Sequence, residues 1–242
     1  LGSRISMILS RCNIRHDVLG DVCVSERSDA RRFIARWRDG VVHLTVPSGV
    51  VDREILDVLD RLAPRLMSKR PAVSYYDDMV IALDGFVFEI KSQSHRPASI
   101  LATVKEDRAY LEVGTDIDMS SDKGRCMVSS MMCRVAAKVA PRMLLPAAAE
   151  LARRLGVEPA SWHIMSGYRT LGKCTSARSI HLSHALVFLP RELRDYIICH
   201  ELAHLTYMCH SRRFHELCDR YCGGREAACI AALKSYRWPI LR

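Results

Sequence analysis

Residues 199–205 read Cys-His-Glu-Leu-Ala-His-Leu, and this stretch decides how the second half of the chain is interpreted. It lies inside residues 191–208, whose apolar spacing predicts a helix that begins just after Pro190, where the missing proline N–H costs nothing. Side chains four residues apart share one face of a helix, so His200 and His204 are expected to point the same way. Histidine pairs at this spacing also occur on helix surfaces and in satisfied cores.

Glu201, beside the first histidine, gives the pair a chemical meaning. Neutral imidazole nitrogens bind zinc, and a carboxylate next to them can reach a water molecule on the metal without completing the coordination itself. The sequence therefore predicts one Zn²⁺ ion per chain, held by His200 and His204. Glu201 is predicted as the general base that activates water for hydrolysis of a peptide bond.

A catalytic zinc ion needs three protein ligands and one open position, so a third ligand is expected. His210 follows His204 by six residues, across an expected helix end, and the chain can turn there and bring it back to the metal. His215 competes for the same role from one turn inside a helix expected at about 212–222. Cys209 is too close to His204 along the chain for an easy tetrahedral angle. We predict His210 as the third ligand and keep His215 as the alternative.

Peptide hydrolysis also needs a donor for the developing oxyanion and a place for the substrate chain. Three side chains near the motif are candidate donors: Tyr207, Arg212 and Lys173. Residues 179–183 are expected to form a strand that precedes the zinc helix. If that strand is a sheet edge, a substrate peptide can pair with it, and Ile180 and Leu182 then belong to the substrate-binding edge.

The first half of the chain has a strand-and-turn pattern. Runs of alternating apolar and polar residues flank turns at Arg38-Asp39-Gly40, at Asp84-Gly85 and at Glu106-Asp107-Arg108. Aspartate followed by glycine is a strong hairpin signal, because glycine accepts the positive φ of tight turns. An amphipathic helix is predicted over residues 52–68. Residues 1–30 show little periodicity, so a poorly defined lead-in is expected there.

The second half changes to helical periodicity. Residues 124–140 and 146–155 are predicted helices, with prolines between them. The fold class predicted from these patterns is α+β, with a small antiparallel sheet and one helix in residues 31–120. Residues 121–242 follow as a helical region that contains the histidine motif and forms one compact unit with the preceding part.

Three further stretches accompany the histidine motif. Residues 168–174 read Tyr-Arg-Thr-Leu-Gly-Lys-Cys, residues 179–183 read Ser-Ile-His-Leu-Ser, and residues 210–214 read His-Ser-Arg-Arg-Phe. Together with residues 199–205, they resemble the YgjP-like metallopeptidase domain, a family related to the SprT-like and WLM zinc-dependent peptidases. The resemblance spans most of the chain and is strongest over residues 168–215.

The resemblance implies His200, His204 and His210 as zinc ligands and Glu201 as the general base. It also implies that residues 121–242 form a gluzincin-like metallopeptidase core, made of a sheet, an active-site helix and a third-ligand helix. The chain departs from the family's usual residues at four positions: Leu171, Ser183, Cys209 and His215.

The composition indicates a folded globular protein of 242 residues with 49% hydrophobic content. No apolar run approaches the roughly 20 residues that span a membrane. Residues 5–9 are shorter than the core of a secretion signal, which has about 7–15 residues. The ten cysteines are scattered without a Cys-x-x-Cys pair, which favours reduced thiols. A cytoplasmic protein without membrane association is therefore expected.

The net charge of +9 permits contact with nucleic acid, but no basic cluster with interleaved aromatic residues appears. Two functions are considered. The first is a peptidase that acts on peptides or proteins. The second is a zinc-stabilised binding module for nucleic acid or a protein partner, without turnover. Glu201 favours the first, because a structural zinc ion has no use for a base beside it. A DNA-associated peptidase would combine both, with DNA affinity that falls steeply with salt.

Overall fold

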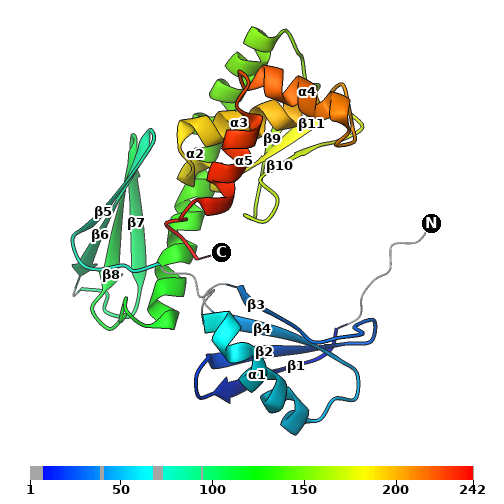
Figure 1. Cartoon of the computed structure of the whole chain (residues 1–242). Coiled ribbons are helices and arrows are strands. Elements are labelled where there is room, and N and C mark those ends of the chain that lie inside the picture. Colours follow the sequence, from blue (N-terminus) through cyan, green and yellow to red (C-terminus); the bar gives the residue numbers. More distant parts are fainter. Residues whose placement is uncertain (1–7, 39–40, 68–72, 94, 242) are drawn as a thin grey trace. The chain divides into compact units, whose positions relative to one another are not determined.

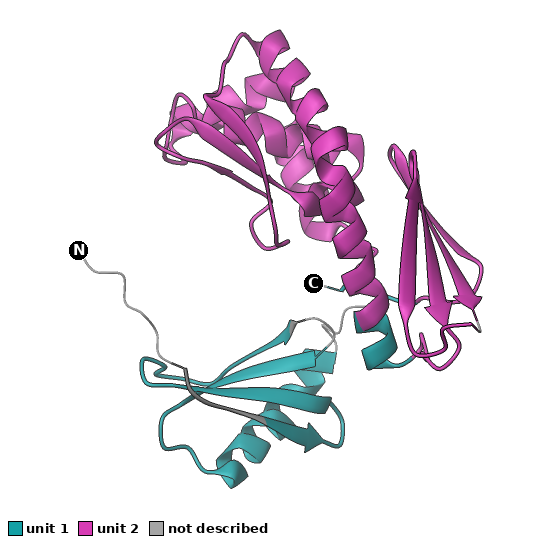
Figure 2. Ribbon diagram, turned by 180° about the vertical axis from the view of Figure 1, so that it is seen from behind, with its two compact units in different colours: residues 1–74, 121–126, 241–242 teal, residues 75–120, 127–240 magenta. Residues whose placement is uncertain are grey.

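The computed structural model describes residues 8–38, 41–67, 73–93 and 95–241 of the chain (Figure 1). The chain divides into two compact units (Figure 2). Unit 1 contains residues 1–74, 121–126 and 241–242, and unit 2 contains residues 75–120 and 127–240. Helices and small sheets together confirm the α+β class. The first boundary between the units follows residue 74, whereas the sequence suggested a change of character after residue 120.

Unit 1 combines a four-stranded sheet with a helix. Its elements are β1 (Ile8–His16), β2 (Gly20–Arg27), β3 (Ile34–Arg38), β4 (Val41–Pro47) and α1 (Asp52–Met67). The strand order is β1-β2-β4-β3, with β2 parallel to β4 and antiparallel pairs on either side. The sheet and α1 share one apolar core, whose buried residues are Leu19, Val22, Val24, Val42, Leu44, Val46, Ile55, Leu59, Ala63 and Leu66.

The first thirty residues differ from the expected lead-in, because β1 and β2 occupy most of residues 8–27. In β2, Val22 and Val24 are buried while their neighbours are less so, which is the two-residue alternation of a strand with one covered face. This alternation is short and interrupted by charged residues, so it produces little visible periodicity. The predicted hairpin of β3 and β4 is confirmed. Asp39 and Gly40 of its predicted turn lie outside the described residues.

Unit 2 begins with a second four-stranded sheet. Its strands are β5 (Met79–Leu83), β6 (Phe86–Gln93), β7 (Ile100–Lys105) and β8 (Arg108–Gly114). The order is β5-β6-β8-β7, with β6 parallel to β8, so this sheet has the same topology as the sheet of unit 1. Both predicted hairpins are confirmed, and Gly85 adopts φ +86° in the first turn.

Both sheets are mixed rather than antiparallel, which corrects the expected architecture. In each sheet, two hairpins pair through their second strands, β2 with β4 and β6 with β8. The second strands of these adjacent hairpins run in the same direction, so the junction between the hairpins is parallel. Turn residues specify a hairpin locally, whereas the pairing between hairpins depends on contacts that are distant in sequence.

Helix α2 (Asp122–Leu155) continues through Pro141 and Pro146, where the sequence predicted an interruption. Each proline removes a backbone hydrogen bond and costs a helix interior about 3 kcal/mol. The helix persists because it buries a long apolar face, formed by Val128, Met132, Val135, Ala136, Val139, Ala140, Leu144, Ala148 and Ala152. In the described part of the chain, no helix combines the length and the apolar character that crossing a membrane requires.

The remaining elements of unit 2 surround the histidine motif. They are β9 (Ser161–Met165), β10 (Gly172–Cys174), β11 (Ser179–Ser183), the 3₁₀ helix η1 (His184–Phe188), α3 (Arg191–Ala203), α4 (Arg212–Tyr221) and α5 (Glu226–Ser235). The three strands form a sheet of order β10-β11-β9, in which β10 is antiparallel and β9 parallel to β11. The sequence predicts neither β10 nor α5.

Helix α3 ends at Ala203 rather than at residue 208. The chain turns there because the N–H groups of Thr206 and Tyr207 both bind the carbonyl oxygen of Ala203. His204 is the C-cap and retains helical dihedral angles, with φ −65° and ψ −19°. His200 and His204 therefore remain one helical turn apart on the same face, as predicted.

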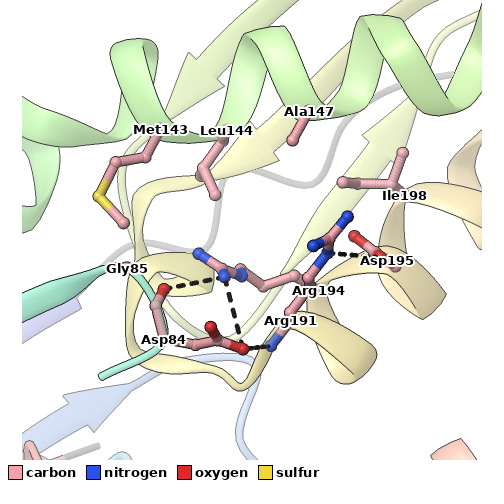
Figure 3. A pocket seen from close by; sticks show the side chains of 9 residues that line it. All are labelled: Asp84, Gly85, Met143, Leu144, Ala147, Arg191, Arg194, Asp195 and Ile198. Atoms are coloured by element: carbon pink, nitrogen blue, oxygen red, sulfur yellow. Dashed lines mark hydrogen bonds and ion pairs between the residues drawn. The ribbon is translucent and has the colours of Figure 1, made fainter. Parts of the chain in front are cut away.

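The turn between β5 and β6 holds the start of α3 (Figure 3). Pro190 offers no side-chain cap, and the carboxylate of Asp84 accepts a hydrogen bond of 2.8 Å from the backbone N–H of Arg191 instead. Arg194 donates to the carbonyl oxygen of Asp84 at 2.9 Å. A pocket of about 370 Å³ lies between this turn, α2 and α3. Its α3 residues lie on the side of the helix opposite His200, so this pocket is separate from the motif.

Candidate metal centre

Three histidine side chains converge where α3 ends. His200 lies in α3, His204 caps the helix, and His210 lies in the connection before α4. One ring nitrogen from each lies within 4.8 Å of the other two, and the Nε2 atoms of His200 and His210 are 3.1 Å apart. Two nitrogens bound to a tetrahedral zinc ion lie about 3.3 Å apart. The donor set and its spacing therefore fit zinc.

Contacts around the three rings orient them. Phe214, fully buried in α4, stacks on His204 with ring centroids 4.4 Å apart, and its centroid is 4.9 Å from those of His200 and His210. The hydroxyl of Ser211 caps α4 by accepting a hydrogen bond from the N–H of Phe214. Nδ1 of His204 donates to the carbonyl oxygen of Tyr207 at 3.0 Å, which leaves Nε2 with its lone pair.

The electrostatic environment keeps the first two histidines neutral at pH 7. Burial, with a smaller contribution from the neighbouring His204 and His210, lowers the pKa of His200 to about 4. Burial also lowers the pKa of His204. A neutral imidazole has a free lone pair, which a metal ligand needs.

Glu201 is enclosed by β10. Its side chain is buried, and burial raises its pKa to about 7, while a hydrogen bond from the backbone N–H of Cys174 acts in the opposite direction. Gly172 approaches the carboxylate so closely that a Cβ atom there would lie 2.4 Å from Oε1 and 2.5 Å from Cγ of Glu201. The missing side chain of Gly172 thus makes room for Glu201, and Cys174 fixes its orientation.

His215 and Cys209 lie apart from the three converging nitrogens. Nδ1 of His215 is hydrogen-bonded to Oε1 of Glu226 at 2.9 Å. Cys209 is exposed to solvent. In the described part of the chain, the histidine cluster that could hold a metal includes His210 and excludes both of these residues.

The candidate oxyanion donors are placed differently from one another. Lys173 is exposed in β10, and alternation along a strand directs it away from the face on which Gly172 meets Glu201. Arg212 is exposed and paired with Glu216 at 2.8 Å. Tyr207 is half-buried and contributes its carbonyl oxygen to His204. Tyr207 therefore stays a candidate, and the geometry does not favour Lys173 or Arg212.

The expected substrate edge is corrected by the sheet order. Strand β11, which carries Ile180 and Leu182, is central and pairs with β10 on one side and β9 on the other. Both side chains are fully buried. An incoming peptide cannot pair with a strand whose two edges are already occupied. Sequence order placed this strand next to the motif, but the short strand β10 covers its edge.

A family model of the YgjP-like metallopeptidase domain matches residues 31–231. The chain belongs to the YgjP-like metallopeptidase family. The resemblance seen in the sequence is thereby confirmed. No curated protein and no solved structure matches the chain. Membership of the YgjP-like family indicates a metallopeptidase, and it implies a metal cofactor and peptide or protein substrates.

Sequence reasoning assigned no role to several residues around the centre of this YgjP-like domain, namely Gly172, Phe214, Cys218 and Glu226. Gly172 and Phe214 lie in the stretches that carry the family resemblance, but the pattern does not say what they touch. Cys218 has the helical spacing of a core residue. Glu226 lies in α5, which the sequence did not predict as a helix, so no local signal connected it with His200.

Burial of Glu201 predicts a pH-dependent stability for the metal-free YgjP-like domain. Its pKa of about 7 in the folded state exceeds the ordinary 4.5, so the folded state binds the proton more tightly than the unfolded state does. The contribution of protonated Glu201 to the free energy of unfolding is fully present below pH 4.5 and is lost as the pH rises to 7. Glu201→Gln should therefore stabilise the metal-free protein by up to about 3 kcal/mol at pH 8 and by less toward pH 5. Denaturant unfolding at both pH values tests this, and a gain that is independent of pH would contradict it.

Proposed function

We propose that this chain is a zinc-dependent peptidase that hydrolyses peptide bonds with Glu201 as its general base. The observation that carries the proposal is the convergence of three histidine nitrogens at the end of α3, where the residue after His200 is the buried Glu201. A structural zinc site is usually closed by four protein ligands, whereas three histidines leave a position open. The alternative of a binding module without turnover has no comparable observation behind it.

Each residue of the centre has a distinct task in this proposal. His200, His204 and His210 hold Zn²⁺, which supplies the Lewis acidity that activates water and polarises the scissile carbonyl. Glu201 accepts a proton on its carboxylate and delivers it to the leaving nitrogen. Because its carboxylate is buried, its affinity for a proton is raised toward neutral pH, where a general base works best.

We also infer that residues 121–242 contain a gluzincin-like core. The sheet of β9, β10 and β11, the active-site helix α3 and the third-ligand helix α4 are its elements. Strand β10 is an edge of that sheet, and it passes directly beside Glu201. An extended substrate that pairs with β10 would therefore have its backbone near the base.

The proposal is tested with the full chain and a complex mixture of peptides. New peptide termini are measured by mass spectrometry after incubation with the zinc-loaded chain, with the chelator-treated chain, and with the treated chain after zinc is restored. We expect cleavage in the first and third samples only. Zinc-loaded protein that produces no new termini, or cleavage that survives complete removal of metal, would contradict the proposal.

Gly172→Ala tests the close approach of β10 to Glu201. The added methyl group occupies space that the carboxylate now fills, so either Glu201 or β10 must move. A displacement of about 1 Å costs on the order of 10²-fold in rate, so kcat should fall about 10²-fold while zinc content is unchanged. Lys173→Ala is the matched control, because it alters the next residue of β10 on the opposite face. An unchanged kcat in Gly172→Ala would show that the contact has no role in catalysis.

A further inference from the structure

A second group of polar side chains lies close to His200 and is separate from His204 and His210. It consists of the thiol of Cys218 from α4 and the carboxylate of Glu226 from α5. A ring nitrogen of His200, the sulfur and a carboxylate oxygen lie within 4.8 Å of one another. Cys218 is fully buried and Glu226 is 7% exposed.

The two ring nitrogens of His200 differ in their surroundings. Its Nε2 atom lies 3.1 Å from Nε2 of His210, on the side of the histidine cluster. Its Nδ1 atom is enclosed by protein and has no hydrogen-bond partner among the described residues. A buried polar group without a partner is rare and unfavourable, so Nδ1 requires an acceptor or a donor nearby.

Glu226 is the group best able to satisfy Nδ1. Its backbone N–H binds the carboxylate of Asp219 at 3.0 Å, and its Oε1 atom binds Nδ1 of His215 at 2.9 Å, so the side chain is held in place. A carboxylate has about four acceptor positions, so more than one donor can be accommodated. Burial raises the pKa of Cys218, which keeps it a neutral thiol and a weak partner.

We propose that Glu226 is a positioning residue that accepts the Nδ1–H of His200 and so keeps Nε2 of His200 unprotonated and directed to the histidine cluster. The proposal rests on the proposed zinc centre. A carboxylate that accepts the outer N–H of a metal-binding histidine fixes its tautomer and makes it a stronger ligand. His215 then has an indirect role, because it holds the supporting carboxylate.

The test compares Glu226→Gln with the unaltered full chain in two measurements. The first is the zinc dissociation constant, obtained by competition with a chromophoric chelator, and we expect zinc binding about 10–100-fold weaker in the variant. The second is the tautomer of His200 in the metal-free chain, read from long-range ¹H–¹⁵N NMR of the ring nitrogens. We expect the proton on Nδ1 in the unaltered chain and a shift toward Nε2 in the variant.

Two controls separate the proposed contact from other effects. Glu216→Gln removes an exposed carboxylate of α4 and should leave both readouts unchanged. His215→Asn removes the other partner of Glu226 and should weaken zinc binding less than Glu226→Gln does, because the carboxylate remains. If Glu226→Gln does not fold, Glu226→Asp retains the carboxylate on a shorter side chain and is expected to keep the Nδ1 tautomer.

Three outcomes would overturn the inference. One is an unchanged tautomer and zinc affinity in Glu226→Gln. Another is a His215→Asn variant as impaired as Glu226→Gln, which would assign the effect to His215. The third is a Glu226→Asp variant that loses the Nδ1 tautomer. A chain that binds no zinc would instead contradict the proposed function, and the tautomer measurement in the metal-free chain would still test Glu226.

Discussion

Glu201→Gln is expected to keep one zinc ion per chain and to lose about 10²–10⁴-fold in kcat on any peptide that the unaltered chain cleaves. Glutamine has the same shape but cannot accept a proton at neutral pH, so the variant lacks the base and retains the three histidines. Zinc content by elemental analysis and the rate of peptide cleavage are measured on the same preparation. Both values are needed, because loss of the metal alone would also abolish activity.

The control for this variant is Glu192→Gln. Glu192 lies on the same helix, is exposed and pairs with Arg225. Its replacement should change neither zinc content nor kcat. Full activity in Glu201→Gln would rule out Glu201 as the base, whereas loss of zinc in that variant would mean that Glu201 takes part in coordination.

His210→Ala is expected to weaken zinc binding by at least about 10²-fold. This exceeds the roughly 10–100-fold effect of removing a residue that only hydrogen-bonds to a metal ligand. Nε2 of His210 lies 3.1 Å from Nε2 of His200, and its side chain is exposed, so its removal should not disturb the core. The zinc dissociation constant of the full chain is measured by competition with a chromophoric chelator. Thermal unfolding of the metal-free protein should be unchanged.

His215→Ala is the matched variant, because His215 is the competing third ligand. Its Nδ1 atom is bound to Glu226, so we expect zinc affinity to change little when it is removed. The opposite pattern, with zinc lost in His215→Ala and kept in His210→Ala, would assign the third ligand to His215. If both variants bound zinc as tightly as the unaltered chain, neither residue would coordinate the ion.

The parts of the centre that follow from local periodicity could be predicted from the sequence. Spacing by four on a predicted helix is enough to place His200 and His204 together. The turn at Asp84-Gly85 is likewise specified by two adjacent residues. His210 required one further assumption, that the chain reverses soon after the helix, and the turn after Ala203 supplies that reversal.

Features that depend on distant contacts were not predicted. The pairing of the two hairpins in each sheet is set by contacts between separate segments, so the parallel junctions are invisible in the turn residues. Strand β10 has three residues, which is too few to show an alternation, and yet it decides that Ile180 and Leu182 are not at a sheet edge. The need for glycine at position 172 follows from its close contact with Glu201, which is distant in sequence.

Local rules can also mislead where packing overrides them. Pro141 and Pro146 predict a break, but the apolar face of α2 outweighs their cost. The short helix α5 has an Ala-rich sequence without a clear polar face, so it escaped prediction. Its buried Glu226 brings a carboxylate close to His200, although the two residues are more than twenty positions apart in sequence.

Zinc K-edge X-ray absorption of the zinc-loaded full chain tests the three-histidine centre most directly. Three histidine nitrogens and one further light atom are predicted, at about 2.0–2.1 Å from the metal. Imidazole ligands also give characteristic outer-shell scattering, so their number can be counted. A sulfur atom at about 2.3 Å would contradict the account, because it would place Cys209 or Cys218 on the metal. Fewer than three imidazoles would contradict it equally.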